Sequence, residues 1–154
     1  MEEFKYVIFQ LGDQRYGMNL LYVNGMVQDY HITPIPNAPE GVKGIINLRG
    51  DVVPVYSLRE RFGMDSRIDN SEKSLLITQS DDMVLAYEVD CVVGIEEMEP
   101  NRINRMPSIA SNEETTFMEE VLHIGENIVI AISADEVLSG EMKMRINQMM
   151  EENQ

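Results

Sequence analysis

An internal repeat limits the folds open to this chain more than any single motif does. The segment Ile45–Phe62 aligns with Val121–Leu138 without a gap, and apolar residues meet apolar residues along most of the stretch. The segment Leu20–Met26 aligns with Val89–Ile95 in the same way. The distance between the copies is too long for a solenoid repeat. It predicts two similar small β-units packed side by side, and the alternative is chance similarity between apolar strands.

The best-defined local feature is a hairpin in the first unit. Two apolar runs, Ile45–Leu48 and Val52–Tyr56, flank Arg49-Gly50-Asp51, a pattern typical of a tight β-hairpin. This hairpin needs no catalytic group, and it would present a rigid surface that carries one cation, Arg49. The segment therefore favours a protein-docking module.

Two helix starts follow the apolar runs of the repeat. Ser57 and Glu60 form one capping-box pattern, and Ser133 and Glu136 form the other. We expect the first helix to end after one or two turns. The second is expected to continue into a C-terminal helix, because apolar residues recur at helical spacing up to Met149.

The rest of the chain alternates apolar strands with polar turns. Three prolines make His31–Pro39 an extended edge-type connection, because each proline removes a ladder donor. Loops are predicted over Gly63–Lys73 and Glu99–Glu114, and the second is expected to be the long mobile stretch. Further strands are predicted over Phe4–Leu11, Arg15–Asn19, Ser74–Gln79, Met83–Val89, Phe117–Ile124 and Ile128–Ser133.

Length and composition describe an ordinary globular protein. The chain has 154 residues, of which 44% are hydrophobic and 25% charged, so one domain with a real core is expected. No apolar run approaches the roughly 20 residues that span a bilayer, and Met1-Glu2-Glu3 does not resemble the basic start of a signal peptide. The single cysteine, Cys91, fits a reducing cytoplasm.

Charge excludes some partners and suggests others. A net charge of −15 argues against nucleic acid, whose phosphates need clustered lysine and arginine, and it would repel anionic membrane surfaces. Eight arginines outnumber four lysines, and Arg49, Arg59 and Arg61 fall in one short segment. Arginine suits protein interfaces, because its planar fork binds carboxylates through two hydrogen bonds.

The sequence predicts no catalytic residue, metal ligand or cofactor. His31 and His123 have no partner at a spacing typical of a metal site. Adjacent carboxylates on a strand point to opposite faces, which does not suit a paired acid and base. This excludes Asp81-Asp82, Glu96-Glu97 and Glu113-Glu114 as such a pair.

The segment Gly44–Phe62 closely resembles the signature of the CheW family, the coupling proteins of bacterial chemotaxis, which reads G-[VI]-x-N-L-R-G-x-[VI]-[VI]-P-[VI]-x-[DS]-L-R-x-[RK]-F. Weaker similarity extends over roughly Phe4 to Leu138. The resemblance implies a CheW-like domain over residues 1–138, with one subdomain at about 14–72 and the other at about 4–12 plus 73–138. Residues 139–154 would form a C-terminal helix and tail.

The implied fold is mostly β: two SH3-like five-stranded β-barrel subdomains packed together, with short helices and a C-terminal helix. The first strand is assigned to the C-terminal barrel, so that the chain folds as one unit. The implied function is a non-catalytic cytoplasmic adaptor. It would couple the cytoplasmic tips of chemoreceptors (methyl-accepting chemotaxis proteins) to the regulatory domain of the histidine kinase CheA, and it would be recruited to membrane-associated receptor arrays.

The resemblance also implies a receptor-binding groove, with Arg49 as its main contact. The predicted groove residues are Val23, Gly44, Asn47, Arg49, Gly50, Val92 and Ile95. From the residues alone, Val23, Val92 and Ile95 are also explained as ordinary core, and Arg49 as a solvated charge at a hairpin tip.

Two positions depart from the family pattern. Gly25 stands where many members carry an acid that can pair with the arginine, and Glu120 stands where they often have glycine. These departures leave open a divergent scaffold that serves a non-chemotactic kinase pathway. A small β-barrel enzyme is the remaining alternative, and a deep pocket with His123 beside two carboxylates would favour it.

Overall fold

The computed structural model describes residues 4–64, 73–80, 83–106 and 117–152, and over these ranges the chain is mostly β. The first repeat contributes β1 (Lys5–Leu11), β2 (Gln14–Asn19), the 3-10 helix η2 (Leu20–Tyr22), β3 (Val23–Val27), β4 (Val42–Leu48), β5 (Asp51–Ser57) and α1 (Leu58–Arg61). The second contributes β6 (Ser74–Ser80), β7 (Met83–Val89), β8 (Cys91–Glu97), the 3-10 helix η3 (Pro100–Arg102), β9 (Ile103–Arg105), β10 (Met118–Ile124) and β11 (Asn127–Ile132). The helix α2 (Gly140–Glu152) follows.

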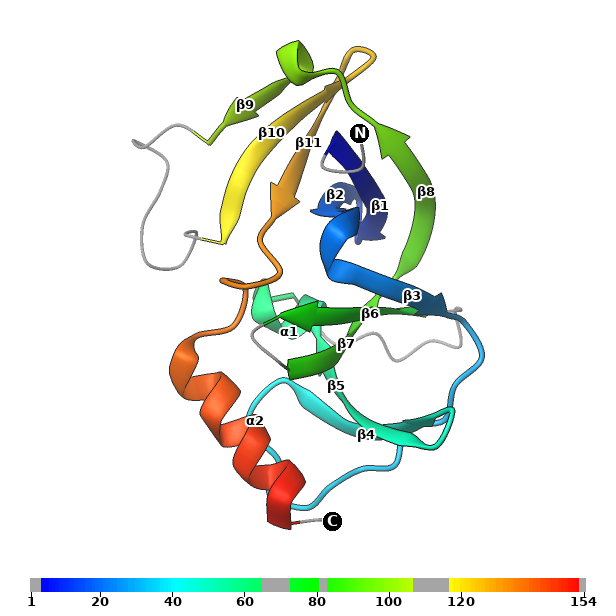
Figure 1. Ribbon diagram of the computed structural model, residues 1–154, viewed down its shortest axis with the longest axis vertical. Coiled ribbons are helices and arrows are strands. Elements are labelled where there is room, and N and C mark those ends of the chain that lie inside the picture. The colour runs from blue at the N-terminus through cyan, green and yellow to red at the C-terminus, as the bar shows by residue number, and fades with distance from the viewer. Residues whose placement is uncertain (1–3, 65–72, 81–82, 107–116, 153–154) are drawn as a thin grey trace.

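The strands form two sheets (Figure 1). The sheet in the upper half of Figure 1 has six strands in the order β8-β1-β2-β11-β10-β9, and the lower sheet has five in the order β3-β6-β7-β5-β4. Both orders are linear, so the described strands make open SH3-like units rather than closed barrels. The mostly β, two-unit fold predicted from the sequence is confirmed.

Each sheet combines strands from both repeats. The alignment of Leu20–Met26 with Val89–Ile95, extended along the chain, also sets β1, β2 and β3 on β6, β7 and β8. The alignment of Ile45–Phe62 with Val121–Leu138 sets β4 and β5 on β10 and β11. The two strand orders then correspond position by position, and β9 is the one addition among the described strands. The first two strands of each repeat therefore lie in the sheet of the other repeat, and the topology confirms the predicted duplication.

This exchange corrects the predicted subdomain limits. The limits at 14–72 and at 4–12 plus 73–138 put β2 in the first unit and both β6 and β7 in the second. In the structure β2 pairs with β1 and β11, whereas β6 and β7 pair with each other and with β3 and β5. Of the four exchanged strands, only β1 joins the sheet predicted for it. The repeat is visible in the sequence, but the pairing partner of a strand is decided by long-range packing.

The register repeats as closely as the order does. Parallel pairing of β11 with β2 sets Ala131 opposite Gly17, and parallel pairing of β5 with β7 sets Val55 opposite Ala86. The repeat relates Val55 to Ala131 and Ala86 to Gly17, so the two pairings are equivalent. β4 and β10 have register shifts at equivalent points, between Val42 and Gly44 and between Met118 and Glu120. The duplication thus extends to the β-bulges.

One core joins the two sheets. It contains Phe9 and Met18 of the six-stranded sheet together with Leu76 and Tyr87 of the five-stranded sheet, and all four are fully buried. Ile146 of α2 completes the same cluster. A smaller cluster lies within each sheet. Because burial of apolar surface is shared across the exchanged strands, the two units are expected to unfold together.

The helices follow the predicted caps with one correction. Ser57 Oγ accepts a hydrogen bond from the Glu60 amide at 3.4 Å and starts α1 as predicted. Ser133 Oγ makes the equivalent bond with the Glu136 amide at 3.2 Å, but only a turn follows. The C-terminal helix begins later, where Ser139 Oγ accepts from the amide of Met142 at 3.1 Å. A capping box satisfies free amides, but it does not decide how far a helix continues.

The predicted connections have different outcomes. Within His31–Pro39, Thr33 forms a single bridge to Ile45, as expected for an edge segment. The segment is not extended throughout, because Pro36 and Asn37 form a turn, with Asn37 at φ 59° and the amide of Ala38 donating to the carbonyl oxygen of Ile35 at 3.3 Å. In the other unit the corresponding segment forms the full strand β9, which is why that sheet has six strands where five are predicted. Most of the predicted loop Gly63–Lys73 lies outside the described residues. Within Glu99–Glu114, residues 100–105 form η3 and β9, and 107–114 lie outside the described residues.

Candidate protein-docking surfaces

Arg49 occupies the tip of the β4–β5 hairpin in a strained backbone conformation. Leu48 pairs with Asp51, so Arg49 and Gly50 form a two-residue turn with φ values of 53° and 90°, as in a type I′ turn. The side chain of Asn47 supports this turn, because its Oδ1 accepts a hydrogen bond from the Gly50 amide at 3.0 Å. Holding a non-glycine residue in this region costs about 1 kcal/mol. Arg49 is exposed, and no ion pair to it exists among the described residues.

An apolar hollow of about 400 Å³ lies between this turn and β3, and we call it the hairpin hollow. Both Arg49 and Gly25 line it. Met26 and Val52 also line it, and they are exposed by 46% and 52%. A Cβ atom added at Gly25 would meet nothing within 4 Å, so this edge of the hairpin hollow has room for a larger side chain.

A second hollow, of about 810 Å³, lies at the equivalent place on the six-stranded sheet, and we call it the β8 hollow. Ile95 and Ile128 line it and are exposed by 50% and 56%. The repeat relates Met26 to Ile95 and Val52 to Ile128. Two equivalent positions in each unit therefore expose large apolar side chains, whereas scattered exposure would have no such symmetry.

The predicted groove residues differ in their exposure and surroundings. Asn47, Arg49 and Gly50 are exposed at the hairpin tip, and Ile95 is exposed in the β8 hollow. Val23 and Val92 are half-buried and pack against the main core. Gly44 is buried and has φ 145°, and a Cβ there would lie 2.2 Å from the carbonyl oxygen of Thr33.

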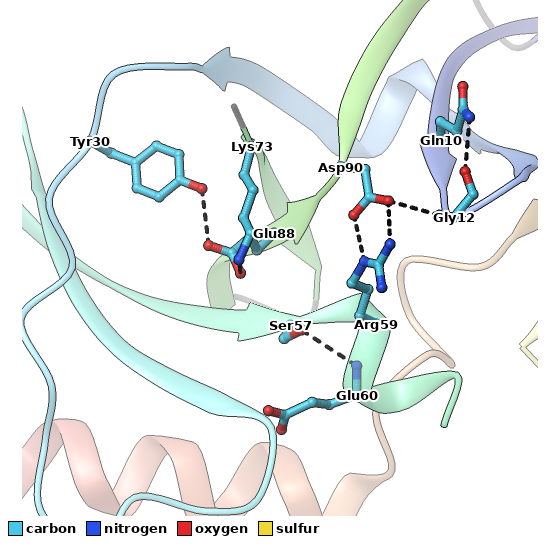
Figure 2. A network of polar contacts seen from close by, with 9 residues as sticks. All are labelled: Gln10, Gly12, Tyr30, Ser57, Arg59, Glu60, Lys73, Glu88 and Asp90. Atoms are coloured by element: carbon cyan, nitrogen blue, oxygen red, sulfur yellow. Dashed lines mark hydrogen bonds and ion pairs between the residues drawn. The ribbon is translucent and has the colours of Figure 1, made fainter. Parts of the chain in front are cut away.

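Arg59 has a structural role (Figure 2). Its Nε and Nη2 atoms donate to Oδ1 and Oδ2 of Asp90 at 2.7 and 2.8 Å, and the same Oδ2 accepts from the amide of Gly12 at 2.7 Å. Asp90 is 5% exposed and lies where the chain passes from β7 to β8. The pair therefore fastens α1 to the crossing point between the two sheets.

Arg61 is also held within the molecule. Its Nε donates to the carbonyl oxygen of Val137 at 2.6 Å, and its guanidinium lies 4.3 Å from the ring centre of Phe117. Val137 is the equivalent of Arg61 in the second unit, so this bond joins the two copies of one position. Of the three clustered arginines, Arg59 and Arg61 stabilise the fold, and only Arg49 faces solvent.

A second polar contact is centred on Glu88 of β7. Tyr30 donates to Oε2 of Glu88 at 2.9 Å, and Lys73 Nζ lies 3.8 Å from Oε1 of the same carboxylate (Figure 2). Burial, and then the charge of Glu88, raise the pKa of Tyr30 above its ordinary value of 10.0. The phenol therefore stays protonated and keeps donating at neutral pH.

The described residues bear on metal binding and on the surroundings of His123. Within them no group of three or more histidine, cysteine, aspartate or glutamate side chains is placed to hold a metal ion. His123 Nε2 lies 2.8 Å from the side-chain nitrogen of Asn104. In the part of the chain that the structure describes, no helix is long and apolar enough to cross a membrane.

Sequence reasoning missed several residues that the structure exposes. Met26, Val52, Val93 and Ile128 line the hollows, yet they read as ordinary strand residues in the sequence. The repeat carried a usable signal, because its alignment sets Met26 on the predicted Ile95. Exposure itself had no sequence signal, since both faces of these strands carry apolar residues.

Comparison with known proteins gives a consistent result. A model of the CheW-like domain matches residues 5–142. The chain is 31% identical over 135 residues to the chemotaxis protein CheW of Rhizobium meliloti (strain 1021), which covers 88% of this chain and 87% of that protein. It is 27% identical over 137 residues to the chemotaxis protein CheW of Klebsiella aerogenes, covering 89% and 82%.

A solved structure is similar over nearly the same length. The crystal structure of the scaffolding protein TtCheW from Thermoanaerobacter tengcongensis superimposes with a TM-score of 0.80 at 31% sequence identity, and it covers 89% of this chain and 92% of that one.

Proposed function

We propose, since this chain belongs to the family of CheW-like domains, that it is a non-catalytic adaptor coupling chemoreceptors to the histidine kinase CheA. The family assignment establishes a chemotaxis scaffold. The two partners, the absence of catalysis and the cytoplasmic location beside receptor arrays belong to our proposal.

The exposed, strained Arg49 is the observation that carries this proposal. A glycine or asparagine would fit its turn without strain, so stability alone does not explain an arginine there. Strained residues persist where they serve a function. A guanidinium that forms no ion pair with the described residues and lies beside an apolar hollow suits a partner that offers a carboxylate next to apolar side chains.

In this proposal the predicted groove residues have two roles. Asn47, Arg49, Gly50 and Ile95 are exposed and would contact the receptor tip directly. The predicted residues Val23, Gly44 and Val92 would shape the surface from behind. The kinase regulatory domain, which is similar in fold, would bind a separate surface. Joint binding would raise the effective concentration, so that moderate affinities suffice to hold an array together.

The test is a fluorescence-anisotropy titration of the full chain, labelled at its N-terminus. A receptor-tip fragment and the kinase regulatory domain from the same organism are added separately and then together. We expect both to bind, and the second partner to bind in the presence of the first. Failure of both to bind at high concentration would overturn the proposal.

The residue-level test uses Arg49→Ala with Arg102→Ala as a matched exposed arginine. Arg49→Ala should weaken receptor binding at least tenfold and leave kinase binding and Tm nearly unchanged, because the side chain makes no internal ion pair with the described residues. Arg102→Ala should change neither binding event. If Arg49→Ala instead lowered Tm by many degrees, Arg49 would be structural and its assigned role would be wrong.

A further inference from the structure

A third hollow, of about 370 Å³, lies at the junction of the two units, away from Arg49, and we call it the junction hollow. Tyr6, Leu21 and Tyr22 form its apolar side, and Glu119 and Glu120 form its acidic side. Leu21 is exposed by 59% and Tyr22 by 37%. The junction hollow thus combines exposed apolar surface with two adjacent carboxylates.

A β-bulge accounts for the placement of both carboxylates. Met118 pairs with Ile132 and Glu120 pairs with Ala131, so Glu119 is the extra residue of β10. Consecutive residues of a regular strand point to opposite faces, but a bulge turns them toward the same side. Glu119 and Glu120 therefore both line the junction hollow, although they are neighbours in the sequence.

The equivalent bulge in the first unit contains a cation. Lys43 is the counterpart of Glu119, and its Nζ lies 2.6 Å from Oε1 of Glu60. The counterpart of Glu60 is Glu136. An attractive pair in one unit is therefore replaced by two like charges in the other. Partial burial, and then the charge of Glu120, raise the pKa of Glu119; a hydrogen bond to Ser133 opposes this rise, while Glu136 and Asp135 add to it.

No internal cation among the described residues compensates these acids. Tyr6 donates to Oε1 of Glu120 at 2.7 Å, which fixes the direction of that carboxylate without neutralising it. Arg105 is the register partner of Glu120 on β9. Within the described ranges, however, neither Glu119 nor Glu120 forms an ion pair with Arg105 or with any other cation.

We propose that the junction hollow is a docking site for an arginine of a partner protein, followed by an apolar side chain that packs on Leu21 and Tyr22. The planar guanidinium fork pairs with two carboxylates at once and stacks on aromatic rings, which a lysine does less well. Charge complementarity favours an arginine, because a cation reduces the repulsion between Glu119 and Glu120 that the bulge creates. The site is separate from the hairpin hollow, so its failure would leave the proposed function intact.

The test is an NMR titration of the ¹⁵N-labelled full chain with the peptide acetyl-Gly-Arg-Leu-Gly-amide. A peptide with citrulline in place of arginine keeps the shape and removes the charge. We expect saturable shifts of the amides of Leu21, Tyr22, Glu119 and Glu120, and at least tenfold weaker binding of the citrulline peptide. Equal binding of both peptides, or shifts confined to other regions, would overturn the proposal. Shifts that depend on protein concentration without peptide would identify a second copy of the chain as the occupant, which also overturns it.

Two double variants separate the site from general electrostatics. Glu119→Gln with Glu120→Gln removes the paired charge and keeps side chains that can bond to Tyr6 and Ser133. Glu151→Gln with Glu152→Gln changes the net charge equally at the exposed end of α2. The first pair should weaken binding of the arginine peptide at least tenfold, and the second less than twofold. Equal effects of the two pairs would show that only net charge matters and would overturn the proposal.

A third variant uses the first unit as its model. Glu119→Lys places at this bulge the residue type that Lys43 supplies at the other, where it can pair with Glu136 as Lys43 pairs with Glu60. The variant should raise Tm and abolish binding of the arginine peptide. Retained binding in a folded Glu119→Lys protein would contradict the proposed role of the carboxylate.

Discussion

The two units of this protein have the same strand order, parallel register and bulges, yet they differ in the side chains at equivalent turns and bulges. The turn after β4 carries Arg49, and the turn after β10 carries Gly125, both with positive φ. The bulge in β4 carries Lys43 and Gly44, and the bulge in β10 carries Glu119 and Glu120.

This difference shows where a duplicated β-fold can diverge. The ladder hydrogen bonds and the shared core fix the backbone of both units, so substitutions that keep the pleat and the burial pattern preserve the register. Turns and bulges lie outside that constraint. The first unit carries the cation Arg49 beside the hairpin hollow, and the second carries the carboxylates Glu119 and Glu120 beside the junction hollow.

The largest expected effect comes from the polar contact that fastens the units together. Asp90→Ala removes the bidentate partner of Arg59, whose side chain is only 16% exposed, and the acceptor of the Gly12 amide. We expect a loss of about 3 kcal/mol in the free energy of unfolding, measured by urea denaturation, because removing Asp90 leaves the charge of Arg59 buried without its carboxylate.

The counterpart of Arg59 in the second unit is Asp135, whose Oδ1 accepts a hydrogen bond from the hydroxyl of Ser80. Asp135→Ala should cost only about 1 kcal/mol, since a single hydrogen bond at a half-buried group is lost. Equal losses for the two variants would mean that the units are fastened symmetrically, contrary to the geometry.

The second prediction concerns one bulge position in both units. Gly44→Ala brings a Cβ to 2.2 Å from the Thr33 carbonyl oxygen at a φ of 145°, so we expect a loss of about 2–3 kcal/mol. The equivalent change, Glu120→Ala, removes one hydrogen bond from Tyr6 and should cost about 1 kcal/mol. Thermal unfolding of the two variants checks the order. A mild effect of Gly44→Ala would show that residues 32–33 move aside easily.

The sequence could predict features that depend on local spacing. Apolar alternation and turn residues sufficed for the strands, the hairpin at Arg49 and the duplication, because these depend on local spacing. The sequence did not predict the exchange of β2, β6 and β7, because the pairing of distant strands depends on the assembled core. Sequence reasoning also grouped Arg59 with Arg49 as an interface residue, because no local pattern indicates that Asp90 folds next to Arg59.

The bulge in β10 was missed for a similar reason. Adjacent carboxylates on a strand were expected to face opposite sides, and Glu119-Glu120 is the pair for which the backbone breaks that rule. A bulge depends on the register between two strands, which the sequence of one strand does not contain. The equivalence with Lys43-Gly44 was the available signal, because a glycine beside a bulge often marks an irregular strand.

The third prediction exchanges the residues of the two turns. Arg49→Gly removes the strain of a positive φ and should raise the free energy of unfolding by about 1 kcal/mol, even though binding of the receptor fragment is lost. Gly125→Arg, at φ 62°, should lower it by about the same amount and should create no receptor site. Urea denaturation and the anisotropy titration measure the two properties separately. Destabilisation by Arg49→Gly would mean that the arginine has a structural contact.

The smallest expected effect is a pH dependence that only the second unit should show. The pKa of Glu119 is raised from its ordinary value of 4.5, so the folded protein holds this proton more tightly than the unfolded chain does. Its contribution to stability is therefore greatest below pH 4.5 and is lost as the pH rises through the folded-state pKa. Glu119→Gln cannot ionise, so its stability relative to wild type should increase as the pH rises through the folded-state pKa of Glu119 and then stay constant, as measured by urea denaturation at each pH. Lys43→Gln at the equivalent bulge should show no such rise, because Lys43 attracts Glu60 where Glu119 faces Glu136. A flat difference for Glu119→Gln would mean that the like charges at this bulge are already screened by water.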